Sequence, residues 1–109
     1  MTEPKPKGID VSHHNGAIDW HKKRADGNVF CSIKATEGLT NIDQMFKRNW
    51  EASADAGFMN CAYHFYHPAL DAKAQAAHFV KVMGKDLKGH LPPLYDFEVF
   101  DGLGGKVTA

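Results

Sequence analysis

Four short apolar segments alternate with helix-like segments along the chain, and this alternation limits the folds available to it. The apolar segments have the length and the content of β-branched and aromatic residues typical of strands; they cover residues 8–12, 29–35, 59–65 and 91–98. Each intervening segment has an aspartate that can cap a helix and a glycine that can end it; the pairs are Asp19 and Gly27, Asp43 and Gly57, and Asp71 and Gly84. The pattern predicts an α/β fold of right-handed βαβ units on a parallel sheet.

The helix-like segments carry apolar stripes that should pack on this sheet. One stripe is predicted for residues four apart, Phe46, Trp50 and Ala54. A second is predicted on the following helix; its members are Ala72, Ala76, Phe79, Val80 and Met83. Between the first strand and the first helix, the Asn-Gly pair of residues 13–16 is expected to form a turn.

Length and charge exclude several classes of protein. A chain of 109 residues can build one domain with a core, but it is well short of the roughly 200–250 residues of a complete α/β barrel. Thirteen basic and thirteen acidic residues leave no net charge, which argues against nucleic acid or a membrane surface as partner. No apolar run approaches the ~18 residues that span a bilayer. The N-terminus lacks the apolar region of a signal peptide, so we expect the protein to stay in the cytoplasm until release, to be exported by another route, or to have lost a leader.

The two cysteines, Cys31 and Cys61, lie within apolar runs and outside any Cys-x-x-Cys pattern. A disulfide or a thiol nucleophile would be the functional interpretation. We expect instead two buried small side chains, because free cysteine is among the most buried residue types.

The segment 91–98 ends in two acids. Its proline pair prevents helix formation, so the residues that follow should form a strand. Asp96 and Glu98 are two apart and would therefore share a face, with backbones roughly 6.6 Å apart. In such a pair an apolar lining and the neighbouring charge raise one carboxyl pKa, leaving one proton donor and one carboxylate, as in glycoside cleavage. The alternative is an ordinary solvated strand end.

The other predicted strands also gather polar residues near their carboxyl ends. Asp10 interrupts the first strand. Lys34 and Glu37 lie at the end of the second, and the third carries Tyr63 beside His64. Parallel strands place their carboxyl ends at one edge of the sheet, where α/β proteins bind ligands. The sequence therefore predicts one site that combines these side chains with the two acids.

Several motifs together carry a resemblance to a known family. They include Gly8-Ile-Asp-Val-Ser-His-His-Asn-Gly, Ile33-Lys-Ala-Thr-Glu-Gly, Ala62-Tyr-His-Phe-Tyr and Leu91-Pro-Pro-Leu-Tyr-Asp-Phe-Glu. Over residues 8–98 the sequence resembles glycoside hydrolase family 25, the Chalaropsis-type lysozymes. The resemblance implies a modified (β/α) barrel that cuts the β-1,4 bond between N-acetylmuramic acid and N-acetylglucosamine in peptidoglycan, with no cofactor. This chain would form the first half of that TIM-like barrel, with four strands and about three helices.

The resemblance also implies roles for individual residues. Glu98 matches the general acid of the family. Asp96 matches a carboxylate that either steers the 2-acetamido group of the substrate or acts more directly. Asp10 matches an acid that supports the site from the end of the first strand.

Three further residues are implied as substrate contacts. Tyr63 matches a tyrosine near the reacting sugar, and Lys34 and Glu37 fall in a loop beside the cleft. A tyrosine packed in the core and a solvated ion pair are equally compatible with the sequence. The histidines at positions 13, 14, 64 and 67 lack metal-ligand spacing, so hydrogen-bonding or surface roles are expected and no metal site is predicted.

The chain departs from the family after the Asp-x-Glu strand, where only residues 99–109 remain. We therefore expect a flexible tail at 1–7, a half-barrel at 8–98 and a truncated segment at 99–109. Either the chain is a fragment of a longer lysozyme, or two copies complete an eight-stranded barrel by two-fold symmetry. The competing functions are a glycan-binding module without turnover and, less favoured, a metal-assisted hydrolase using Asp10, Asp96 and histidines.

Overall fold

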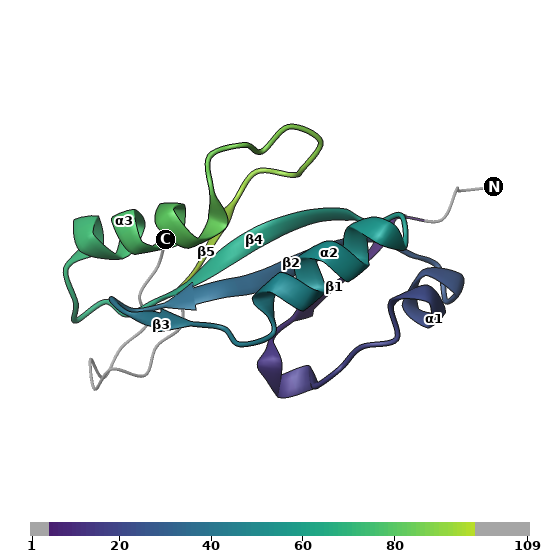
Figure 1. Ribbon diagram of the computed structural model, residues 1–109, viewed down its shortest axis with the longest axis horizontal. Coiled ribbons are helices and arrows are strands. Elements are labelled where there is room, and N and C mark those ends of the chain that lie inside the picture. Colours follow the sequence, from purple (N-terminus) through teal and green to yellow (C-terminus); the bar gives the residue numbers. More distant parts are fainter. Residues whose placement is uncertain (1–4, 98–109) are drawn as a thin grey trace.

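Four parallel strands form a curled sheet in the order in which they occur in the chain (Figure 1). The computed structural model describes residues 5–97. The parallel strands are β1 (Lys7–Val11), β2 (Asn28–Glu37), β4 (Met59–Tyr66) and β5 (Leu94–Phe97). Their connections contain α1 (Trp20–Ala25), α2 (Phe46–Asp55) and α3 (Ala72–Met83). The predicted fold class, a parallel α/β half-barrel with four strands and three helices, is confirmed.

Two short elements were not predicted. Residues 13–16 form the predicted turn, in which the Gly16 N–H donates to the His13 carbonyl at 3.0 Å, and within it His13–Asn15 make a 3-10 helix, η1, capped by Ser12. Strand β3 (Asn41–Ile42) pairs antiparallel with the end of β2, so that the loop after β2 folds back on it as a hairpin. Elements of two or three residues are too short for hydrophobic periodicity to reveal them.

The helix caps agree with the sequence at two of three positions. Asp19 accepts a hydrogen bond from the backbone N–H of Lys22, and Asp71 accepts one from that of Ala74. The cap predicted at Asp43 is wrong: α2 begins after Met45, which makes no side-chain cap. The Asp43 carboxylate instead binds the backbone N–H of Met45 and both the backbone and the ring of His13. It ties η1 to the loop before α2.

The core lies between the sheet and the helices. Its buried members come from three consecutive strand–helix units; they are Val11, Ile18, Trp20, Cys31, Ile33, Ala35, Phe46, Phe58, Ala62 and Phe79. The predicted helix stripes are only partly right, because Ala54, Ala72 and Val80 are exposed. A step of four residues turns about 40° around a helix, so Ala54 lies well off the face defined by Phe46. Polar residues complete these buried faces; they are Asn49, Ser53 and Gln75.

Gln75 is the centre of a buried hydrogen-bond network behind β4. Its Oε1 lies 2.9 Å from His64 Nε2 and accepts from the backbone N–H of His67, while its Nε2 donates to the carbonyls of His67 and Leu70. These contacts fix the orientation of the amide, so the His64 Nε2 carries the proton. The other ring atom, Nδ1, lies 2.7 Å from Thr36 Oγ1 and accepts its hydrogen. The network joins β2, β4 and α3, with His64 as a neutral imidazole.

This neutral histidine makes the stability depend on pH. Burial lowers the pKa of His64 below its usual value of 6.5, despite the hydrogen bond with Gln75. Below that pH the unfolded chain takes up a proton that the folded chain excludes, so the free energy of unfolding falls as the pH drops, by at most about 1.4 kcal/mol per pH unit. Urea unfolding at pH 7.5 and 5.5 measures this loss. It should shrink in His64→Gln and persist in His21→Gln, a change at an exposed histidine; equal stability at both pH values contradicts it.

Both cysteines are buried and free, as predicted. Burial raises the pKa of Cys31 to about 12 and also raises that of Cys61. Because the thiolate is the reactive form, both thiols should react slowly in the folded protein. A thiol reagent such as Ellman's reagent is expected to leave the native protein unlabelled and to label two thiols in denaturant. Rapid labelling of the folded protein would contradict this.

Candidate active site

The face of the sheet opposite the core carries the predicted site residues. Side chains alternate along a strand, so residues paired in register and separated by two positions share this inner face. Asp10 pairs with Ser32, Lys34 with Tyr63, and Phe65 with Asp96; the six are Asp10, Ser32, Lys34, Tyr63, Phe65 and Asp96. The carboxyl ends of all four parallel strands thus contribute to one surface, as expected from the topology.

Two adjoining hollows cover this surface. The first, of about 220 Å3, is lined by Asp10, Ser32, Tyr63, Leu94, Tyr95 and Asp96. The second, of about 510 Å3, is lined by Ser12, His14, Lys34, Glu37, Tyr63, Phe65 and Asp96. They share Tyr63 and Asp96, and we refer to them together as the cleft. Five of the six predicted site residues line it; the sixth, Glu98, lies outside the described residues.

Asp10 is positioned by a serine that the sequence analysis did not single out. The Ser32 hydroxyl donates a hydrogen bond to Asp10 Oδ1 across the β1–β2 pair. Ser32 is buried, whereas Asp10 is exposed on the open inner face. A signal for Ser32 was present, because it lies two residues before Lys34 on a predicted strand and so shares its face.

Lys34 and Glu37 form a largely buried pair and not a solvated one. Lys34 is only 5% exposed, and its Nζ lies 2.5 Å from Glu37 Oε1 and 5.0 Å from the centre of the Phe65 ring. The other Glu37 oxygen lies 2.9 Å from His67 Nε2. Burial raises the pKa of Glu37, but the hydrogen bonds and charges of Lys34 and His67 outweigh it, and the pKa lies below its usual value. Glu37 therefore favours its ionised form and pairs with the Lys34 side chain at the cleft.

Tyr63 and His64, adjacent in sequence, point to opposite faces of β4. Tyr63 lines both hollows of the cleft, and His64 is buried with Gln75 on the core side. Among residues 5–97, no group of three or more His, Cys, Asp or Glu side chains is placed to hold a metal ion. Within the same range no helix has the length and apolarity needed to cross a bilayer.

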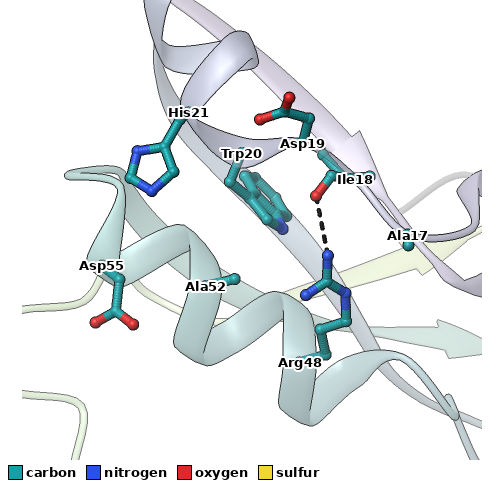
Figure 2. Close-up of a pocket in the computed structure, with 8 residues that line it drawn as sticks. All are labelled: Ala17, Ile18, Asp19, Trp20, His21, Arg48, Ala52 and Asp55. Atoms are coloured by element: carbon teal, nitrogen blue, oxygen red, sulfur yellow. Dashed lines mark hydrogen bonds between the residues drawn. The ribbon is translucent and has the colours of Figure 1, made fainter.

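A separate hollow of about 490 Å3 lies between α1 and α2 (Figure 2). Arg48 reaches from α2 to donate a hydrogen bond to the carbonyl of Ile18 at 3.2 Å, with the Trp20 ring beside it (Figure 2). Asp55 and His21 lie at its other end (Figure 2). None of the predicted site residues lines this hollow. Its Arg48 contact braces the segment before α1 against α2.

Comparison with known proteins finds one family. The family model described as glycosyl hydrolases family 25 matches residues 9–108. Lysozyme M1 of Streptomyces globisporus is 39% identical over 95 residues, which are 84% of this chain and 32% of that protein. A family 25 glycosyl hydrolase structure from Bacillus anthracis matches with TM-score 0.84 and 34% identity, covering 88% of this chain and 44% of that one.

A bacterial lysozyme structure from Streptomyces coelicolor matches with TM-score 0.81 and 36% identity, covering 92% of this chain and 48% of that one. The chain thus spans about a third to a half of the length of these relatives. The residues matched by the family model, 9–108, include every residue that lines the cleft.

Proposed function

This chain belongs to glycosyl hydrolase family 25, and we propose that its cleft is part of a muramidase site. The substrate is peptidoglycan, cut at the β-1,4 bond between N-acetylmuramic acid and N-acetylglucosamine. The observation that carries this proposal is the meeting of Asp10, Tyr63 and Asp96 in one hollow at the strand ends. Named lysozymes among the relatives support the same reaction.

Glycoside hydrolysis requires a proton donor for the leaving oxygen and a negative charge near the anomeric carbon. We assign the first role to Glu98, which follows β5 directly in the sequence. Asp96, at the cleft wall, supplies the second as a carboxylate that stabilises the oxocarbenium-like transition state. Asp10, oriented by Ser32, lies in the same hollow and adds negative charge. Glu98 protonates the leaving oxygen as the bond between it and the anomeric carbon breaks. Water then adds its oxygen to the anomeric carbon, and the proton it loses restores Glu98 to its acid form.

The inner face of the sheet is open and partly apolar, which bears on how the site is completed. Met59 is 48% exposed and pairs in register with Phe30, which is 39% exposed, and Leu94 is 50% exposed. Among residues 5–97, no further strand pairs with β1 or β5. We propose that a second copy of this chain can cover the face, with β5 of each copy beside β1 of the other. Light scattering after size-exclusion chromatography should then give twice the mass of 12.1 kDa; a stable monomer refutes the pairing.

The open face also favours a second candidate, a glycan-binding module without turnover. Asp10 and Leu94 are exposed to solvent on the inner face. A site open on one side positions water and substrate less well than an enclosed one, and positioning contributes much of enzymatic rate. This module would bind the same wall polymer through the same cleft.

Clearing of a suspension of purified cell walls separates the two candidates. The muramidase proposal expects the wild type to clear the walls and Glu98→Gln, which removes the proton donor, to fail. Both proteins should still sediment with walls. If neither protein clears walls but both bind them, the binding module is the correct function; if neither binds, both candidates fail.

A further inference from the structure

A side pocket opens beside the cleft and is used by none of the catalytic roles proposed above. It measures about 230 Å3 and is lined by His13, Lys34, Asn41, Ile42, Asp43 and Gln44. Lys34 also lines the cleft, so the buried ammonium stands where the two spaces meet. The binding surface is therefore forked, with Lys34 at the branch.

The wall of the side pocket is held in place by several hydrogen bonds. Strand β3, which provides Asn41 and Ile42, pairs with β2. His78 on α3 donates from Nε2 to the Asn41 carbonyl at 2.9 Å, and the backbone N–H of Asp43 donates to the Ala35 carbonyl at 2.9 Å. The opposite wall is fixed because His13 binds the Asp43 carboxylate through its backbone and its ring. Such a pocket requires little ordering when a ligand enters.

The chemistry of the lining matches a short peptide. His13 Nδ1 donates to the Asp43 carboxylate at 2.7 Å, so in the neutral ring Nε2 is an acceptor suited to a peptide N–H. Lys34 carries three N–H groups, of which Glu37 accepts one, and Gln44 adds an exposed amide. Ile42 is 56% exposed and offers an apolar surface to a small side chain.

We propose that the side pocket binds the first residues of the peptide arm carried by the lactyl group of muramic acid. The inference rests on the proposed function, since it needs the glycan in the cleft. Each muramic acid unit is itself branched, with a sugar chain in one direction and a peptide in the other. A forked surface with a cation at the branch fits that shape, and the Lys34 ammonium would donate to the lactyl carbonyl.

Binding of two defined ligands tests the proposal. The probes, titrated into the full chain by NMR, are the N-acetylglucosamine–N-acetylmuramic acid disaccharide with its lactyl carboxyl blocked as the N-methylamide, called the bare disaccharide, and the same disaccharide extended from that carboxyl by L-alanyl-D-isoglutamine. One hydrogen bond with the Gln44 amide and one methyl group packed on Ile42 together correspond to about tenfold in affinity, so the arm should tighten binding by about that factor. The double variant Ile42→Ser with Gln44→Ala, both exposed positions, should remove this gain while leaving the affinity for the bare disaccharide unchanged.

Leu39→Ser is the matched control, because Leu39 is an exposed apolar residue of the same loop that does not line the side pocket. It should retain the full tenfold gain. Equal affinity of the wild type for both ligands, or a gain that survives in the double variant, overturns the peptide-arm proposal alone. If the wild type binds neither ligand, the proposed function fails, and this inference fails with it.

Discussion

Asp96→Asn is expected to lower the rate of wall clearing by about 10²–10³-fold while wall binding changes little. Asparagine keeps the size and the hydrogen-bonding atoms of the side chain but removes its charge. In the proposed mechanism the carboxylate lies where positive charge develops at the anomeric carbon, so its loss should affect the transition state far more than the bound substrate. Removal of such a group costs about 3–4 kcal/mol. Initial clearing rates and sedimentation with walls measure the two quantities separately.

Asp55→Asn provides the control for this prediction. Asp55 is an exposed carboxylate in the hollow between α1 and α2, outside the cleft. The same chemical change there should leave the clearing rate within a factor of two or so, as expected for surface substitutions. A clearing rate of Asp96→Asn equal to that of the wild type would remove Asp96 from the mechanism.

Gln75→Leu is expected to destabilise the fold by about 3–5 kcal/mol, a large part of the stability of a small domain. Leucine fills a similar volume but makes none of the hydrogen bonds of the amide. It would leave the His64 Nε2–H, the backbone N–H of His67 and two carbonyls without their partner. Because Gln75 is fully buried, water does not replace these bonds without disturbing the loop after β4. The midpoint of urea unfolding at pH 7.5 measures the effect.

The identical substitution at an exposed glutamine, Gln44→Leu, should change stability by less than about 0.5 kcal/mol. If Gln75→Leu is as stable as the wild type, the network is not a source of stability. A second consequence concerns the cleft, because the same amide holds the backbone of His67, whose ring binds Glu37. Gln75→Leu should therefore also loosen Lys34, which would be visible as increased motion of its side chain by NMR.

The fold was predictable because strand and helix alternate with clear periodicity and because parallel strands pool their carboxyl ends. That rule predicts that Asp10, Tyr63 and Asp96 lie together, and all three line the first hollow of the cleft. Competition between alternative hydrogen-bond partners for one side chain was not predictable. Asp43 has the sequence context of a helix cap, yet its carboxylate is satisfied by His13, thirty residues earlier in the chain. A contact of that kind depends on the tertiary arrangement of η1 and leaves no periodic signal.

Buried polar residues account for most of the other positions that the sequence pattern did not assign to the core or to the site. Three polar residues, Asn49, Ser53 and Gln75, lie on the buried faces of the helices. An apolar periodicity identifies a buried face by its hydrophobic residues alone, so it does not detect them. The spacing of Gln75 and Phe79, four residues apart, would have placed Gln75 on the buried face had polarity not excluded it. The same applies to Ser32, whose role depends on the acid opposite it in the sheet.

The location of the core has a consequence for biosynthesis. All its buried members belong to successive strand–helix units between Val11 and Phe79, on the side of the sheet away from the cleft. Once these units have left the ribosome, all the residues that form the core are available to pack against one another. The strand–helix units of this chain up to Phe79 can therefore pack against one another during translation, before the residues that follow them are synthesised.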